Sequence, residues 1–261
     1  MALMTIRFRS AALKRTVSFA AIVPLDKILT EGEKIPEKFR TLYLLHGYTN
    51  DQWEWFLGST IEEYAHTYNM AIILPSIENS FYLDDAKREA YYAKYIGEEL
   101  ISWTRRAFPL SDKREDTLIG GLSMGGFGAI RNGLYYNEVF GGIMAMSSAL
   151  ITDEVSKMKA GEGNPVASYD YYAHTFGSPE KLLGSDNDPK ALAEKLLKGN
   201  KRIPKIYMAC GTEDFLLEPN RDMHRHLEKL GIEHKYEEGP GEHNMKFFNP
   251  YLARGLAWYF V

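Results

Sequence analysis

Thr117-Leu-Ile-Gly-Gly-Leu-Ser-Met-Gly-Gly-Phe-Gly-Ala129 is the stretch that decides the fold, because it predicts an apolar strand that turns sharply into a helix with Ser123 at the bend. Gly121 and Gly125 flank the serine in the pattern G-x-S-x-G, and a side chain at either glycine would collide with a neighbouring strand or helix. Such a turn lifts the hydroxyl clear of the sheet and predicts a nucleophile. The alternative is a glycine-rich turn with an incidental serine. The apolar strand before it and the helix-compatible run 127–136 after it favour the nucleophile.

Several other short apolar runs have the profile of strands buried on both faces. They are Thr41–Gly47, Met70–Pro75, Gly142–Met146 and Lys205–Cys210. Segments of helix length lie between them, at 60–68, 89–108, 125–136 and 219–230. This alternation predicts a mostly parallel central sheet with helices on both faces. Alternating residues from Ile6 and a second extended run at 17–23 predict a hairpin at the start, and the charged stretch 26–38 predicts a loop.

The whole chain, residues 1–261, is expected to form a single α/β domain. Residues 148–203 interrupt the alternation with glycines, prolines, an aromatic cluster and one plausible helix, 190–198. Because this segment lies between a central strand and the strand that starts at Lys205, it would cover the carboxyl edge of the sheet. A cap or lid insertion is therefore predicted, and the alternative is a surface segment without a functional role.

Composition excludes several classes of function. The chain is 45% hydrophobic and 25% charged, and 31 basic against 35 acidic residues give a net charge of −4 without a basic patch, which argues against a nucleic-acid partner. No stretch approaches the ~20 apolar residues of a membrane span, and the N-terminus lacks a signal-peptide pattern. The lone Cys210 fits a reducing compartment. We expect a soluble cytoplasmic protein without a membrane partner, and nothing in the sequence indicates an oligomeric state.

Two further polar residues are expected beside Ser123. Ligands of an open parallel sheet bind outside the carboxyl ends of its strands. Asp214 comes shortly after the strand that ends at Cys210, with Glu213 as the local alternative, and His243 follows the expected last strand, 234–237. Serine, acid and histidine then stand in the order of a catalytic triad. The histidine would take the serine proton, and the acid would hold the imidazole tautomer.

The remaining site residues follow from this arrangement. The N–H groups of Met124, at the start of the helix, and of Tyr48, after an early strand, are the expected oxyanion donors. Trp53, Trp55 and Tyr82 would bring aromatic surface for the substrate, with simple packing as the alternative. His224 and His226 diverge on their helix, so no metal site is predicted. Cys210 is a lesser alternative nucleophile, since no base follows it at the required spacing.

Four segments together resemble the esterase D-type branch of the α/β-hydrolases, and most closely its tributyrin-esterase-like members. They are Leu44-Leu-His-Gly-Tyr48, Gly121-Leu-Ser-Met-Gly-Gly-Phe-Gly-Ala129, Cys210-Gly-Thr-Glu-Asp-Phe-Leu216 and Gly239-Pro-Gly-Glu-His243. The family includes feruloyl esterases, acetylxylan esterases, S-formylglutathione hydrolases and mycolyltransferases. Its members often carry a tryptophan shortly after the final histidine, where this chain has Asn244 and Met245.

The resemblance implies a serine carboxylesterase that needs no metal or organic cofactor and acts on a small-molecule ester, such as a short-chain, acetyl or feruloyl ester, through an acyl-enzyme. S-formylglutathione thioesterase and acyl transfer to a sugar alcohol are the alternatives within the same class. A hydrolase-fold binding protein without activity is the alternative from another class.

Overall fold

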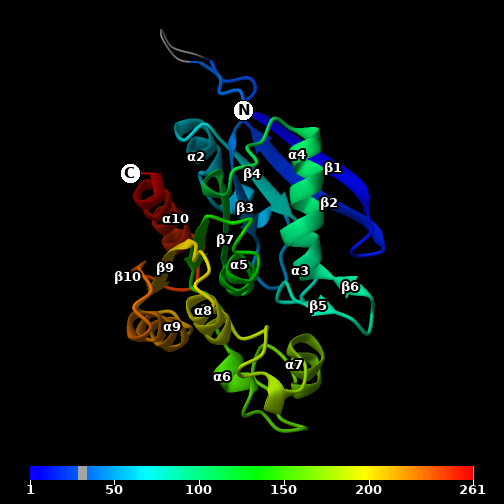
Figure 1. The fold of residues 1–261 in the computed structure, drawn as a ribbon, viewed down its shortest axis with the longest axis vertical. Helices are drawn as coiled ribbons and strands as arrows, with labels where there is room; N and C mark the ends of the chain where they lie inside the picture. Colours follow the sequence, from blue (N-terminus) through cyan, green and yellow to red (C-terminus); the bar gives the residue numbers. More distant parts are fainter. Residues whose placement is uncertain (29–33, 261) are drawn as a thin grey trace.

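In residues 1–28 and 34–260, which a computed structural model describes, eight strands form one sheet in the order β1-β2-β4-β3-β7-β8-β9-β10 (Figure 1). Strands β1 and β2 form an antiparallel hairpin, and β2 is antiparallel to β4. All pairs from β4 to β10 are parallel, which confirms the mostly parallel sheet and the opening hairpin. The strands are β1 (Ala2–Ser10), β2 (Arg15–Val23), β3 (Arg40–Leu45), β4 (Met70–Pro75), β7 (Thr117–Leu122), β8 (Gly142–Met146), β9 (Lys205–Gly211) and β10 (His234–Gly239).

Helices cover both faces of the sheet because the inner strands are apolar on both sides. In β3, Tyr43 and Leu45 face one buried cluster, which includes Phe127 of α5, whereas Leu42 and Leu44 face a second cluster, which includes Leu252 of α10. The first cluster also takes side chains from α4, α8 and α9, and the second from α1 and α2. The bounds are α1 (Glu54–Gly58), α2 (Ile61–Thr67), α4 (Leu100–Ala107), α5 (Met124–Tyr135), α8 (Pro189–Lys198), α9 (Leu217–Lys229) and α10 (Met245–Phe260).

The predicted boundaries differ from the observed ones where tertiary contacts add or interrupt elements. The expected helix 89–108 begins only at Tyr92 as α3 (Tyr92–Lys94), continues through a π-helical turn at 95–99 and ends with α4. A small hairpin of β5 (Asp84–Asp85) and β6 (Ala90–Tyr91) precedes it. The expected loop 26–38 has no regular structure where it is described, and its residues 29–33 lie outside the described residues. Short 3-10 turns occur at Arg114–Asp116 and Pro179–Lys181.

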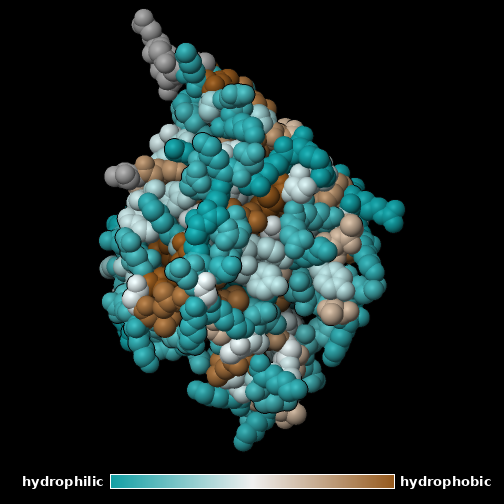
Figure 2. Space-filling view, viewed as in Figure 1, coloured by the Kyte–Doolittle hydropathy of each residue, from teal (hydrophilic) through white to brown (hydrophobic). Residues whose placement is uncertain are grey.

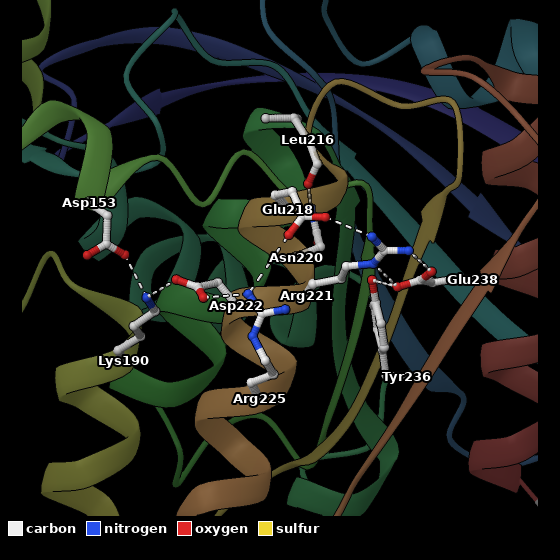
Figure 3. A network of polar contacts seen from close by, with 10 residues as sticks. All are labelled: Asp153, Lys190, Leu216, Glu218, Asn220, Arg221, Asp222, Arg225, Tyr236 and Glu238. Atoms are coloured by element: carbon white, nitrogen blue, oxygen red, sulfur yellow. Dashed lines mark hydrogen bonds and ion pairs between the residues drawn. The ribbon is translucent and has the colours of Figure 1, made fainter.

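The segment between β8 and β9 contains α6 (Thr152–Val155), α7 (Tyr169–Phe176) and α8, and it forms the lower part of the molecule in Figure 1. Lys190 of α8 joins this segment to the body, since its Nζ lies 2.6 Å from Oδ2 of Asp153 and 2.9 Å from Oδ2 of Asp222 on α9 (Figure 3). Residues of α6, α8 and α9 are therefore tied together next to the turn that carries Asp214.

The face shown in Figure 2 is mainly hydrophilic, with hydrophobic side chains in small separate groups. None of the helices in the described part of the chain combines the length and apolar character that crossing a membrane requires.

Candidate active site

Ser123 lies in the turn between β7 and α5 with φ 54° and ψ −118°, a backbone conformation that costs a non-glycine residue about 1–3 kcal/mol. The turn is held by backbone hydrogen bonds from Ser123 N to Met146 O (3.0 Å) and from Ala149 N to Ser123 O (2.9 Å). A Cβ atom on Gly121 would lie 2.4 Å from the carbonyl of Gly125, and one on Gly125 would lie 2.5 Å from Leu45 O. This close approach confirms the steric reason for both glycines.

Asp214 and His243 follow the carboxyl ends of the neighbouring strands β9 and β10 and lie in direct contact. Nδ1 of His243 is 2.8 Å from Oδ2 of Asp214, whose side chain is fully buried. Burial alone raises the pKa of Asp214, but the hydrogen bonds from His243 and from the Leu216 N–H outweigh it and hold that pKa below its usual 3.8. Because a carboxylate only accepts, Nδ1 carries the proton and Nε2 is left as the basic nitrogen.

The two alternatives for the acid and the nucleophile have other surroundings. Glu213 is exposed, and its carboxylate accepts from the N–H of Gly241 and the hydroxyl of Thr212 rather than from His243. Cys210 is buried inside β9, and burial together with nearby Asp214 raises the pKa of its thiol to about 12. The thiol is thus protonated at neutral pH, and a protonated thiol is a poor nucleophile.

A cavity of about 810 Å³ lies over the carboxyl ends of the strands and exposes Ser123 and His243 together, along with Tyr48 and Met124. Seven of its lining residues come from the segment after β8: Ala149, Ile151, Glu154, Asn164, Pro165, Val166 and Tyr172. Its lining holds the carboxylates of Glu54 and Glu154 and, within the described part of the chain, no lysine or arginine. No hydrogen bond joins Ser123 Oγ to His243 among the described residues, and such a bond commonly tightens only when substrate is bound.

Two backbone N–H groups are free at this cavity. Neither the N–H of Tyr48 nor that of Met124 has an acceptor in the parts of the chain that are described. The Met124 N–H opens the 12-residue helix α5, where the helix dipole favours negative charge. Both donors therefore remain available to a ligand oxygen.

The loop that carries Tyr48 is held by side chains from other elements. The indole Nε1 of Trp55 donates to Leu45 O at 2.9 Å, and the hydroxyl of Tyr82 donates to His46 O at 2.9 Å. The ring of His46 lies 2.7 Å from Gly47 O through Nδ1 and accepts the Ile77 N–H at Nε2. His46 is therefore a neutral, buried structural residue, and burial lowers its pKa.

The aromatic residues predicted as substrate contacts are placed elsewhere. Trp53, Trp55 and Tyr82 are not among the residues that line the cavity, and Trp55 and Tyr82 are buried behind the loop that they hold. The aromatic lining consists instead of Tyr48, Phe81, Tyr172, Phe215 and Phe248. Phe215 is 70% exposed, and its ring centroid lies 4.8 Å from that of His243. The sequence did not predict this contact, although the position of Phe215 directly after Asp214 could have indicated it.

The described residues contain no group of three or more histidine, cysteine, aspartate or glutamate side chains that could hold a metal ion. His224, one of the histidines that the sequence left unassigned, lies against His234 with Nδ1 2.8 Å from Nε2, outside the cavity.

Comparison with known proteins places these features in context. The family model described as "Putative esterase" matches residues 10–259. An acetyl esterase of Caldicellulosiruptor saccharolyticus is 48% identical over 260 residues, which cover 99% of this chain and 98% of the relative.

Two solved structures from Staphylococcus aureus are also similar. The fluorophosphonate-binding serine hydrolase F has a TM-score of 0.86 and 27% identity, covering 100% of this chain and 98% of its own. An S-formylglutathione hydrolase has a TM-score of 0.84 and 26% identity, covering 100% and 99%.

Proposed function

The chain belongs to the putative esterase family of α/β-hydrolases and is an esterase, and from this premise we propose that it is a serine carboxylesterase with Ser123, His243 and Asp214 as its catalytic triad. The observation that carries the proposal is the 2.8 Å contact between His243 and Asp214 at a cavity that also exposes Ser123. Its substrates are short-chain or aryl carboxylic esters. Acetyl esters are the first candidates, because a relative with 48% identity is an acetyl esterase.

The reaction proceeds in two halves. Nε2 of His243 takes the Ser123 proton as Oγ attacks the ester carbonyl, and the resulting imidazolium is stabilised by Asp214. The tetrahedral oxyanion accepts from the N–H groups of Tyr48 and Met124, each worth about 3–4 kcal/mol in the transition state. His243 then protonates the leaving alcohol, and a water that it activates releases the acyl group from Ser123.

Residues 148–203 act as the cap of this site within a single domain formed by residues 1–261. Support comes from the seven residues after β8 that line the cavity. The cavity volume of about 810 Å³ is much larger than an acetyl group needs. The cavity therefore has room for the alcohol part of the ester or for an aryl acyl group.

Thioester hydrolysis on glutathione is the second candidate, supported by the 26% identical S-formylglutathione hydrolase. Two carboxylates and no lysine or arginine line the cavity of this chain, within its described part. Because glutathione is itself an anion, this lining favours neutral esters over glutathione thioesters.

Two measurements test the proposal. A fluorophosphonate probe should label the protein at Ser123, and Ser123→Ala should fold normally, escape labelling and lose about 10³-fold or more in kcat. Undiminished labelling of the alanine variant would refute the assignment of the nucleophile, and an unlabelled wild-type protein would favour a binding protein.

A panel of acetyl, butyryl, feruloyl and S-formylglutathione substrates, compared by kcat/KM, then ranks the substrate classes. Acetyl and other neutral esters are expected to lead. A preference for the glutathione thioester would overturn the ester assignment, and a sugar acceptor that diverts the acyl group from water would identify a transferase.

A further inference from the structure

Glu54 is a half-buried carboxylate at the active-site cavity that the triad does not use. It is the first residue of α1 and lines the cavity together with Ser123 and His243. Its Oε2 accepts the Gly47 N–H at 2.6 Å, and its Oε1 accepts Nδ2 of Asn50 at 2.6 Å. Both partners belong to the loop that carries the Tyr48 N–H.

The position of Gly47 shows what this contact controls. The peptide between His46 and Gly47 is held at both ends, by Glu54 at its N–H and by the Tyr82 hydroxyl at its carbonyl. The carbonyl of the next peptide, between Gly47 and Tyr48, lies 2.7 Å from Nδ1 of His46. In a trans peptide the N–H points opposite to the carbonyl, so the Tyr48 N–H is directed away from the His46 ring. Two fixed peptide planes thus set the direction of one free donor.

The absence of a side chain at Gly47 permits the carboxylate to lie against the loop. A Cβ atom there would lie 3.3 Å from Oε2 and 3.4 Å from Oε1 of Glu54, and 2.8 Å from Cδ1 of Leu122. The carboxylate is therefore in close contact with the backbone of the loop as well as hydrogen-bonded to it, and a side chain at position 47 would press on both Leu122 and Glu54.

We propose that Glu54 is a positioning residue of the oxyanion hole, which fixes the Gly47 peptide so that the Tyr48 N–H points at the oxygen that becomes negative in the transition state. This inference rests on the proposed serine esterase function and adds a residue to it. Because the donor serves the oxyanion and not the neutral ester, Glu54 acts on kcat far more than on KM.

The balance of charge around Glu54 is consistent with this role. Burial raises the pKa of Glu54 above its usual 4.5, while the Gly47 N–H and the nearby His243 and Asn50 side chains counter that rise. Asp51 adds a smaller repulsion. A group that accepts at Oε2 suffices to hold the Gly47 N–H, so an uncharged acceptor of the same shape should replace it in part.

The experiment compares three variants with the wild-type protein on p-nitrophenyl acetate. Glu54→Ala removes the acceptor, Glu54→Gln keeps an oxygen of the same reach, and Glu62→Gln is the matched control because it neutralises an exposed carboxylate in the first turn of the neighbouring helix α2. Glu62 does not line the cavity, and no hydrogen bond joins it to the loop that carries Tyr48 in the described part of the chain. Thermal unfolding establishes that each variant is folded.

Loss of one oxyanion donor typically costs about 10²–10³-fold in kcat, so misdirecting it should lower kcat of Glu54→Ala about 10–100-fold. KM should stay within about threefold, and Glu54→Gln should recover most of kcat. Affinity for a boronic acid that forms a tetrahedral adduct on Ser123 should fall in parallel with kcat, whereas Glu62→Gln should leave kcat and this affinity within about twofold of wild type.

An Ala variant with unchanged kcat, or one in which KM rises and boronate affinity is unchanged, would overturn the proposal. If Glu54→Ala does not fold, Glu54→Asp decides, because its carboxylate is one methylene too short to reach the Gly47 N–H and should show the same loss of kcat. Failure of the esterase function itself is distinguishable, since the wild-type protein would then neither turn over the ester nor react with the fluorophosphonate.

Discussion

Asp214→Asn is the substitution whose effect the site geometry fixes most sharply. In the folded protein Oδ2 of Asp214 contacts Nδ1 of His243 at 2.8 Å, and Oδ1 accepts the Leu216 N–H at 2.9 Å. Both oxygens therefore face donors. An asparagine amide offers one acceptor oxygen and one NH₂ group in place of the two carboxylate oxygens. In either orientation the NH₂ group faces a donor, which is the Leu216 N–H in one orientation and Nδ1–H of His243 in the other. The second clash can be relieved by a change of the His243 tautomer.

The orientation of the asparagine amide with the lower free energy determines the effect on catalysis. The Leu216 N–H cannot change its proton, whereas the His243 ring can, so the amide oxygen should turn to Leu216 and its NH₂ group to Nδ1. His243 then carries its proton on Nε2, where it can no longer accept one from Ser123. A triad held in the wrong tautomer loses about 10⁴-fold in kcat, which is about 5 kcal/mol at 1.36 kcal/mol per tenfold.

The assay is the pre-steady-state and steady-state hydrolysis of p-nitrophenyl acetate at pH 7 to 8. We expect kcat to fall about 10⁴-fold with KM changed less than tenfold, and acylation to slow as much as turnover. Glu213→Gln is the matched control, because Glu213 adjoins Asp214 but hydrogen-bonds Gly241 and Thr212. A folded Asp214→Asn variant within tenfold of wild type, or an equal loss in Glu213→Gln, would refute the reasoning.

Two further outcomes are expected. Asp85 lies in the β5–β6 hairpin; burial raises its pKa, but the side chain and backbone N–H of Arg88 and the side chain of His174 together lower it to about 2. Because this value lies below that of the unfolded chain, the carboxylate stabilises the fold above about pH 4, and the free energy of unfolding falls as the pH drops through about 2. Between pH 4 and 2 the free energy of unfolding, measured by urea titration, should fall less for Asp85→Asn than for the wild-type protein. Parallel plots of this free energy against pH for the two proteins would contradict the prediction. Phe215→Ala removes an exposed ring beside His243 and should lower kcat/KM about 3–10-fold more for feruloyl than for acetyl esters, whereas equal losses would place Phe215 outside the substrate contact.

The strands of the central sheet could be predicted closely because their sequences leave little choice. Met70–Pro75, Thr117–Leu122 and Gly142–Met146 were expected from their apolar runs and are β4, β7 and β8 with the same bounds. A run that is apolar on both faces can only be buried in the middle of a covered sheet, so local sequence and tertiary structure agree. The elements α6 and α7 were missed because they have only four and eight residues, and helices this short form only in contact with the rest of the protein.

The aromatic residues that line the cavity could not be predicted because side-chain direction there depends on an unusual backbone. Phe81 and Tyr82 both have positive φ, 50° and 57°, and neither position is a glycine that would have indicated this conformation in the sequence. This turn leaves Phe81 at the cavity and sends Tyr82 into the interior, where its hydroxyl reaches His46 O. Glu54 was overlooked for a similar reason, since its role depends on Gly47, seven residues earlier, and not on any local pattern.

The relative position of the two free N–H donors rests on contact between backbones. Gly125 of α5 lies so close to the early loop that a Cβ atom would be 2.5 Å from Leu45 O and 2.6 Å from His46 O. The turn that presents Met124 and the loop that presents Tyr48 therefore touch through main-chain atoms, which cannot change rotamer as side chains do. Donors fixed in this way need no reorganisation when charge develops on the substrate, and this is the condition under which such hydrogen bonds lower a barrier most. The strained φ of Ser123 is held in the same turn by the backbone hydrogen bonds with Met146 and Ala149, so the position of the proposed nucleophile and the direction of the donors depend on adjoining main-chain contacts.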